Sequence, residues 1–372
     1  MSSPRTHVSL DGQWTLAYDA QHAGMKARWF EAIPEKDFRE VALPSMQSQG
    51  IAAQGGVGWF FKSFDFDSAW QGQSAELHLE ASNYPLEAWR NGTLLGSHTG
   101  GGTPARFPVS AHLRPAANLI AVRLVIAGPG EELVGEPLQR YPMASLGGVS
   151  LHLMPKAHIA SVFVQPDIRP KRVMALVEAP SGCTVRLSIT GTDCAVEGEP
   201  GELIVEFPEF TAWSPETPEC YTLRASLMDS GSEVDACEVR FGMREFTVKD
   251  ERFYLNNRPF FVKAVSCLPQ YPQSLKADKL SALLRRELGL VKDGGFNTIR
   301  VESGPAPASL LELAAEPGVL VFQEVCPPDR VARTSDWEGM TEALVTRDRN
   351  ETALVAWCGL RAPKPGRAQE HC

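Results

Sequence analysis

Charged residues close successive strand-like runs in the last third of the chain. Arg300 follows the run at residues 296–299, Glu302 comes two residues later, and Glu324 closes the run at residues 319–323. Parallel strands bring their carboxyl ends to one edge of a sheet, so these side chains can meet there. A guanidinium group forks around a carboxylate, and we expect Arg300 to pair with Glu302 or Glu324.

Trp357 lies in a further apolar run, at residues 353–357. A buried core position is the simpler interpretation of this tryptophan, and a flat face for stacking against a sugar ring is the alternative.

Other common chemistries lack their signatures. The eight histidines never stand four residues apart, so we expect neither a metal site nor a cofactor. The glycines at 100–102 lack the lysine of a phosphate loop, and Gly-x-Ser-x-Gly does not occur. No Cys-x-x-Cys pair is present; we expect reduced thiols, with a disulfide among the first four cysteines as the alternative: Cys183, Cys194, Cys220 and Cys237.

The elements that must position these side chains change character along the chain. Short alternating segments separated by turns fill residues 8–155, and Asn91-Gly92 between two of them predicts a type I′ hairpin. Six or seven further strand patterns follow over residues 158–241, at the spacing of an immunoglobulin-like sandwich. Trp213 in this part is expected in the core.

After Gly242 the pattern alternates between strands and helices. A buried strand is expected at 260–265, and apolar residues at helical spacing predict a helix over 279–292. Strands are expected at 296–301, 319–324 and 353–357, and helices at 308–316 and 337–346. This alternation is typical of parallel βα units.

Composition limits the partners. The 372 residues carry a net charge of −9, which argues against a nucleic acid or an anionic membrane. No apolar run has the length of a signal peptide or of a membrane span, so we expect a soluble, cytoplasmic protein.

The order of these units resembles glycoside hydrolase family 2, which contains β-galactosidases, β-glucuronidases and β-mannosidases. The motifs that carry the resemblance are Leu10-Asp11-Gly12-Gln13-Trp14, Trp89-Arg90-Asn91-Gly92, Gly147-Gly148-Val149, Gly295-Phe296-Asn297-Thr298-Ile299-Arg300 and Trp357-Cys358-Gly359. The resemblance implies a jelly-roll sugar-binding-like domain at 1–157, an immunoglobulin-like β-sandwich at 158–242 and the N-terminal half of a (β/α)8 TIM barrel at 243–372.

By the same resemblance the reaction is retaining hydrolysis of a β-glycoside, which needs two carboxyl groups. Arg300 matches an arginine that lines the family's active site, and Glu324 matches a glutamate that faces the pocket; a structural ion pair is the alternative for both. With Trp357, they are the expected substrate-binding residues.

No catalytic residue can be named. The family places Asn-Glu just after strand four, and here those positions fall on Arg361 and Ala362. The 130 residues after Gly242 compare with about 250 for a whole barrel, so four strands fit. We therefore expect no hydrolysis by this chain, possible homo-oligomers through the open strand edges, and a noncatalytic carbohydrate-binding or interaction protein as the alternative.

Overall fold

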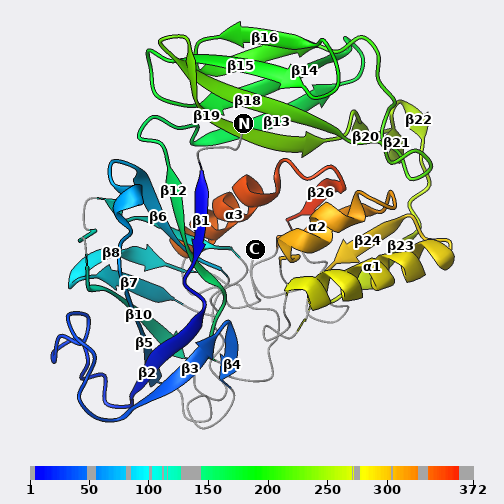
Figure 1. Ribbon diagram of the computed structural model, residues 1–372. Coiled ribbons are helices and arrows are strands. Elements are labelled where there is room, and N and C mark those ends of the chain that lie inside the picture. The colour runs from blue at the N-terminus through cyan, green and yellow to red at the C-terminus, as the bar shows by residue number, and fades with distance from the viewer. Residues whose placement is uncertain are drawn as a thin grey trace.

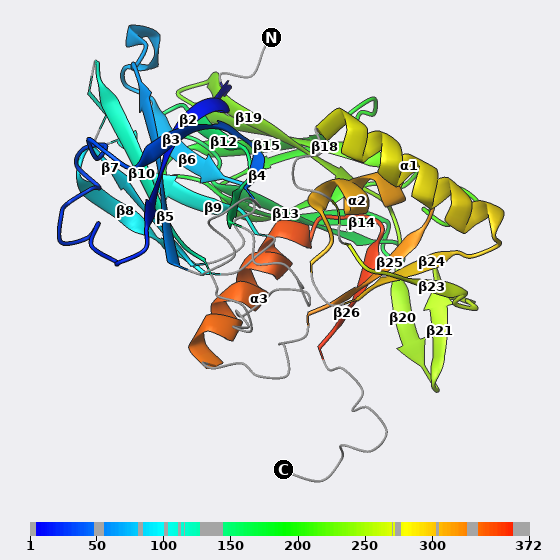
Figure 2. The ribbon, with the colours of Figure 1, turned by 90° about the horizontal axis from the view of Figure 1, so that it is seen from below.

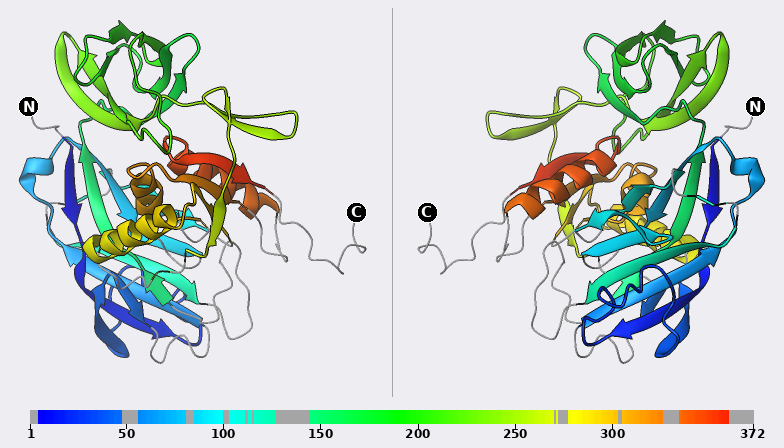
Figure 3. Two further views of the ribbon diagram at one scale, coloured as in Figure 1. Left: turned by 90° about the vertical axis from the view of Figure 1, so that its right-hand side faces the viewer. Right: turned by 90° about the vertical axis from the view of Figure 1, so that its left-hand side faces the viewer.

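Two antiparallel β-sandwiches and one parallel α/β unit make up the computed structural model (Figure 1). The structure describes residues 5–359 except 48–55, 81–84, 100–102, 111–112, 115, 127–143, 270, 272–276, 303–304 and 326–333. The glycines at 100–102 lie outside these residues, as do Cys326, Arg361 and Ala362. Figure 3 shows the second sandwich above both the first sandwich and the α/β unit.

The first sandwich packs a four-stranded sheet against a six-stranded one. The smaller sheet runs in the order β1 (Thr6–Ser9), β12 (Val149–Met154), β6 (Ser74–Leu79) and β9 (Ala105–Pro108). The larger sheet runs in the order β3 (Phe38–Leu43), β2 (Gly12–Asp19), β5 (Gly56–Phe64), β10 (Asn118–Ile126), β7 (Leu86–Arg90) and β8 (Thr93–His98). The short pair β4 (Ser45–Gln47) and β11 (Ala144–Leu146) and the 3-10 turn Ser68–Trp70 complete it.

Alternation along these strands builds the first core. Inward-facing residues such as Trp14, Phe60, Leu77 and Val122 are buried between the two sheets. The predicted hairpin is confirmed between β7 and β8, where Asn91 and Gly92 have φ values of 47° and 82°. Asparagine and glycine tolerate this left-handed backbone, which is why they mark the turn.

The second sandwich is immunoglobulin-like. One sheet contains β13 (Ser161–Asp167), β14 (Arg172–Glu178) and β17 (Gly201–Glu206); the other contains β16 (Ala195–Gly198), β15 (Thr184–Ile189), β18 (Tyr221–Asp229) and β19 (Ser232–Phe241). Trp213 is fully buried, as predicted. Cys183, Cys194, Cys220 and Cys237 are all free thiols, so the alternative of a disulfide among them is wrong.

The α/β unit follows a small antiparallel sheet of β20 (Phe246–Lys249), β21 (Arg252–Leu255) and β22 (Arg258–Pro259). Its parallel sheet has the order β23 (Ala264–Cys267), β24 (Thr298–Val301), β25 (Leu320–Glu324) and β26 (Leu354–Cys358). The helices are α1 (Ala277–Asp293), α2 (Ala308–Ala314) and α3 (Thr334–Asp348). Figure 2 shows α1 and α2 on one side of the sheet and the β20–β21 hairpin on the other.

The first predicted strand of this unit is wrong in its bounds and its burial. Residues 260–263 are not part of a strand, β23 begins at Ala264, and the Phe261 side chain is 78% exposed. An apolar run predicts burial only if neighbours exist on both faces, and β23 is an edge strand among the described residues.

Hydrogen bonds join the α/β unit to the second sandwich. The indole Nε1 of Trp213 donates to the carbonyl oxygen of Ala315 at 3.2 Å. Asn350, just after α3, accepts from the backbone N–H of Val164 at 2.9 Å and donates to the carbonyl of Val162 at 2.8 Å. The α/β unit is therefore held against the second sandwich by hydrogen bonds at two places.

Candidate functional site

Arg300 and Glu324 meet at the carboxyl end of the parallel sheet. Nη2 of Arg300 donates to Oε1 of Glu324, and the two groups form an ion pair. The Glu324 side chain is 3% exposed and the Arg300 side chain 42%, so the arginine shields the carboxylate from solvent. The hydrogen bond to Glu324 raises the pKa of Arg300, which keeps the guanidinium charged.

This pair confirms the prediction that Arg300 pairs with a glutamate at the strand ends. Side chains alternate between the faces of a strand, and Ile299, Val301 and Val321 pack into the core beneath the helices. Arg300 and Glu324 therefore project from the opposite face of the sheet, away from α1 and α2.

Glu302 lies on the other side of the guanidinium. Its Oε1 is 3.8 Å from Nε of Arg300 and accepts a hydrogen bond of 2.6 Å from the Ser266 hydroxyl. The Glu302 backbone N–H also donates to the carbonyl oxygen of Cys267 at 2.9 Å, which extends the pairing of β23 and β24 by one residue. Glu302 is thus held by both its side chain and its backbone.

Cys358 joins the same face from β26. The strand register pairs Cys358 with Glu324. Burial raises the pKa of the Cys358 thiol, and the charges of Arg300 and Glu324 act on it as well. The thiol is consequently a neutral neighbour of the ion pair.

Trp357 is not brought together with Arg300 and Glu324. The register pairs it with Gln323, whose side chain accepts from the backbone N–H of Ala306 near α2. Paired residues in neighbouring strands share a face, so Trp357 projects from the side of the sheet that carries the helices. Its side chain is 40% exposed, so the interpretation of Trp357 as a buried core residue is wrong.

Aromatic side chains lie beside Arg300 on the same face of the sheet, because the register pairs Phe322 with Arg300. The ring of Phe322 lies 5.9 Å from that of Phe246 and 5.9 Å from that of Phe253, both from the β20–β21 hairpin. The face therefore carries aromatic rings next to its charged side chains.

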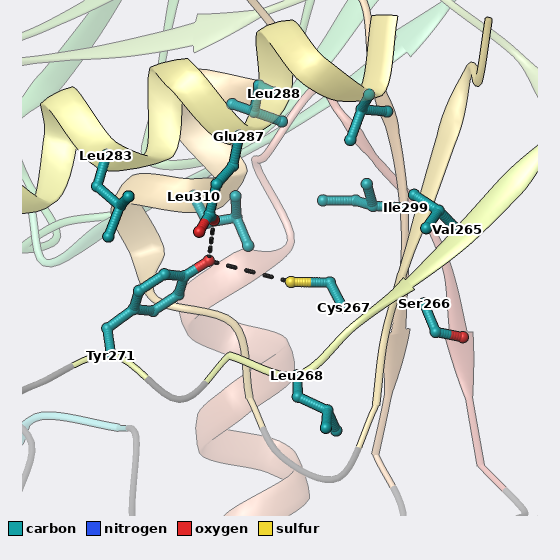
Figure 4. A pocket seen from close by; sticks show the side chains of 11 residues that line it. Val265, Ser266, Cys267, Leu268, Tyr271, Leu283, Glu287, Leu288, Ile299 and Leu310 are labelled. Carbon is teal, nitrogen blue, oxygen red and sulfur yellow. Dashed lines mark hydrogen bonds between the residues drawn. The ribbon is translucent and has the colours of Figure 1, made fainter. Parts of the chain in front are cut away.

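A separate cavity of about 360 Å³ lies at the edge of the sheet, between β23 and α1 (Figure 4). Its walls are mainly aliphatic, and the Tyr271 hydroxyl donates to Glu287 at 2.6 Å inside it. Burial and the bond to Glu287 raise the pKa of Tyr271, so the phenol is neutral. The cavity is lined by Val265 and Ile299, which face the helices, and its lining also includes Ser266, which is paired with Arg300.

Ser266 and Cys358 complete a site for which the sequence predicted Arg300, Glu302 and Glu324. Strand register is the signal that could have found them, because Ser266 is paired with Arg300 and Cys358 with Glu324. Within the described ranges, no cluster of three histidine, cysteine or acidic side chains could hold a metal ion. Across the same ranges, no helix is both long and apolar enough to span a membrane.

Two family models match the chain. The sugar binding domain of glycosyl hydrolases family 2 matches residues 7–143, and the model named glycosyl hydrolases family 2 matches residues 157–244. The first covers the larger part of the first sandwich, and the second covers the immunoglobulin-like sandwich.

Curated relatives include glycosidases from several bacteria. A "Beta-galactosidase 2" of Enterobacter cloacae is 26% identical over 81% of this chain and 33% of the relative. A "Putative beta-glucuronidase" of Formosa agariphila is 25% identical over 82% of this chain and 31% of the relative. The chain thus spans about a third of the length of these relatives.

Solved structures share the fold across all three parts. The β-glucuronidase of Ruminococcus gnavus superposes with a TM-score of 0.78 at 18% identity, covering 96% of this chain and 67% of that one. The same enzyme in complex with D-glucuronic acid gives a TM-score of 0.77. Taken with the two family models, this common order of sandwiches and α/β unit identifies the chain as a glycosyl hydrolase family 2-like protein.

Proposed function

We propose that the chain binds a β-glycoside at the strand ends that carry Arg300 and Glu324, in the architecture of a retaining β-glycosidase. In this proposal residues 243–372 form the N-terminal half of a (β/α)8 barrel, and residues 1–157 and 158–242 form the sugar-binding-like and immunoglobulin-like domains that support it. The observation that carries the proposal is the Arg300–Glu324 pair at the carboxyl end of a parallel sheet, where barrel enzymes hold their substrates.

The chemistry of the rim suits a sugar. Carboxylates accept hydrogen bonds from sugar hydroxyl groups, and a guanidinium group donates to hydroxyl and ring oxygens. Arg300 is 42% exposed while it holds Glu324 in place, so the exposed part of its guanidinium can reach a ligand. The Phe322 ring, paired in register with Arg300, adds an apolar surface beside the guanidinium.

We further propose that this 372-residue chain does not hydrolyse glycosides by itself. Retaining hydrolysis needs an acid/base carboxyl and a nucleophilic carboxylate about 5–5.5 Å apart. The positions after β26 at which the family carries Asn-Glu are Arg361 and Ala362, and neither side chain can protonate a leaving group. In this proposal Glu324, which is buried and paired with Arg300, positions the guanidinium.

The free thiols support a reducing compartment as the place of action. Five cysteines among the described residues are free thiols, namely Cys183, Cys194, Cys220, Cys237 and Cys267. Disulfides are rare where thiols are kept reduced, so we propose a cytoplasmic location. Thiol titration of protein purified without reductant and denatured in the absence of air should recover every cysteine as free thiol, and a lower count in monomeric protein would contradict this.

Turnover and binding are tested separately. Purified chain is incubated with 4-nitrophenyl β-D-galactoside, β-D-glucoside, β-D-mannoside and β-D-glucuronide, and release of nitrophenol is expected to equal the rate without protein. The corresponding methyl glycosides are then titrated while the unfolding temperature is followed, because a ligand of the folded state stabilises it in proportion to RT ln(1 + [L]/Kd). At least one of these glycosides is expected to raise the unfolding temperature.

Arg300→Ala should abolish this stabilisation. The matched control is Arg285→Ala, which removes an exposed arginine paired with Glu316 at 3.1 Å on the helix side of the unit. Turnover above the protein-free rate would refute the lack of hydrolysis. Stabilisation that survives Arg300→Ala would place the sugar elsewhere and favour the alternative, a noncatalytic protein that binds carbohydrate through its first sandwich.

A further inference from the structure

The cavity between β23 and α1 has apolar walls and reaches the surface. Leu288, Ile299 and Leu310 line it and are almost fully buried. Leu268, just after β23, lines it as well and is 57% exposed, so the cavity opens to solvent there. Its volume of about 360 Å³ lies in the range of pockets that hold small organic ligands. Since a cavity of about 150 Å³ can hold a benzene ring, this one has room for a larger apolar body.

One corner of this cavity is polar (Figure 4). The Tyr271 hydroxyl donates to Oε2 of Glu287 at 2.6 Å, and the Cys267 sulfur lies 4.0 Å from the Tyr271 oxygen. These side chains come from β23, from the segment after it and from α1, and they point toward one another. The tyrosine directs its one proton at Glu287, so the second carboxylate oxygen can accept a hydrogen bond from a ligand.

Glu287 carries a negative charge that its own helix does not balance. The four residues one turn away on α1 are all apolar: Leu283, Leu284, Leu290 and Val291. No lysine or arginine can therefore reach Glu287 along the helix. In the described part of the chain, its side chain has a hydrogen bond to Tyr271 and no ion pair. A carboxylate between aliphatic walls, with a neutral phenol as its partner, favours a cation beside it.

We propose that this cavity is a second binding site, for a small organic amine that carries its ammonium group on an apolar body. The ammonium group donates to Glu287, and the apolar body packs against Leu288, Ile299 and Leu310. Because an ammonium group has three N–H donors and no acceptor, it fits a corner whose oxygens accept. A charged donor bonds to a carboxylate more strongly than a neutral hydroxyl does.

This site is independent of the proposed glycoside site. Ile299 lines the cavity on the helix side, whereas Arg300 projects from the opposite face of the sheet. Ser266 also lines the cavity, but its hydroxyl donates to Glu302, and Figure 4 shows it pointing away from the polar corner. Amine binding and glycoside binding can therefore fail or succeed separately.

The test compares three ligands of similar shape that differ in charge. 2-(2-Naphthyl)ethylamine, 2-(2-naphthyl)ethanol and 2-naphthylacetic acid are titrated into the 372-residue chain at pH 7.5, and ligand-observed NMR gives the dissociation constants. We expect the amine to bind with a dissociation constant below about 1 mM, and about ten-fold more tightly than the alcohol or better. The acid should bind more weakly than the alcohol, because its charge has the sign of Glu287.

Glu287→Gln isolates the charge. The amide keeps the shape of the side chain, and its carbonyl oxygen can still accept from Tyr271. The affinity for the amine should fall by about ten-fold, and the affinity for the alcohol should change by less than about two-fold. Glu238→Gln removes the same charge from the second sandwich, at a side chain that is 58% exposed, and should change neither affinity. An amine affinity unaffected by Glu287→Gln would overturn the proposal.

Leu283→Trp fills the cavity from α1 and should abolish binding of both the amine and the alcohol. The matched control is Leu290→Trp, the same change on the same helix at a side chain that is 61% exposed and is not part of the lining. It should leave both affinities unchanged, and thermal unfolding verifies that each variant is folded. If Leu283→Trp does not fold, Glu287→Gln decides.

Three results would overturn the proposed amine site and leave the proposed glycoside site standing. They are the absence of amine binding to the wild-type chain at 10 mM, equal affinities of the wild-type chain for amine and alcohol, and amine binding that survives in folded Leu283→Trp.

Discussion

The imidazole rings of His78 and His152 stack with their centroids 3.6 Å apart on neighbouring strands of the first sandwich. His7 from β1 adds an edge-on contact at 4.7 Å to the ring of His152, and Glu76 accepts from His78 at 3.0 Å. Burial and then the neighbouring His78, His7 and Arg106 lower the pKa of His152 to about 4, against a raising contribution from Glu76. Three adjacent strands thus share one cluster of rings, in which the lowered pKa keeps His152 neutral near pH 7.

This cluster predicts acid sensitivity. A histidine whose pKa is about 4 in the folded chain and 6.5 when unfolded stabilises the fold fully above pH 6.5, and the stabilisation is lost as the pH falls towards 4. Because the ring is only partly shielded from solvent, we expect a loss of about 1–2 kcal/mol. Urea unfolding at pH 7.5 and pH 5 measures it. His152→Phe should reduce the difference in the free energy of unfolding between the two pH values, whereas His22→Phe, in an exposed turn, should not. The same difference for wild type and His152→Phe would contradict the prediction.

Glu351 titrates in the opposite sense. Burial, followed by repulsion from Asp348 and Glu312, raises its pKa to about 7. The folded chain therefore holds a proton that the unfolded chain has lost between pH 4.5 and 7, and the stability falls as the pH rises through this window. Glu351→Gln should raise the free energy of unfolding by about 1–2 kcal/mol at pH 8 and by little at pH 5.

The measurement is again urea unfolding at both pH values. Glu238→Gln, at a side chain that is 58% exposed, serves as the charge-matched control and should change little at either pH. An equal effect of Glu351→Gln at pH 5 and pH 8 would show that the amide acts through packing and that the raised pKa is not the cause.

Arg5 ties the first strand to the second sandwich. Its Nε and Nη2 donate to the two oxygens of Asp235 at 2.9 and 2.6 Å, and Nη2 also donates to the Ile159 carbonyl. The Asp235 side chain is fully buried, so Arg5→Ala leaves an uncompensated charge and should cost about 2–4 kcal/mol. Limited proteolysis should then release the two sandwiches from each other.

Arg172→Ala provides the comparison for this pair. Arg172 lies 3.6 Å from Asp167 with both side chains more than 40% exposed, and its loss should change the stability by less than about 0.5 kcal/mol. Equal effects of the two substitutions would refute the role of Arg5 as a tether.

Gly318 permits the close approach of the α/β unit to the second sandwich. Its φ is 71°, and a Cβ atom at this position would lie 2.7 Å from Cα of Pro215. Gly182 has a φ of 86° with nothing within 4 Å of such an atom. Gly318→Ala and Gly182→Ala share the backbone strain of about 1 kcal/mol, and Gly318→Ala adds a clash with backbone. The unfolding temperature should fall clearly further for Gly318→Ala than for Gly182→Ala. Similar shifts would mean that the backbone at Pro215 moves to make room for the added methyl group.

Local patterns predicted most of the elements. Asn91-Gly92 marks a real hairpin, and the apolar spacing after Lys279 predicts the helix that the structure places at Ala277–Asp293. Both signals act over a few residues, through allowed backbone angles and through one buried helix face. The run at 260–265 misled because burial of a strand depends on what packs against it, and that information lies elsewhere in the chain.

The sequence by itself determined the order of two sandwiches and an α/β unit, the family resemblance, and the meeting of Arg300 with a glutamate, because strand patterns and motif order are local. Only the tertiary structure decided which side chains share a face. The register of four parallel strands puts Ser266 and Cys358 beside the Arg300–Glu324 pair and turns Trp357 to the helix side. A shift of one residue exchanges the two faces of a strand, and register is set by contacts between segments that lie far apart in the sequence.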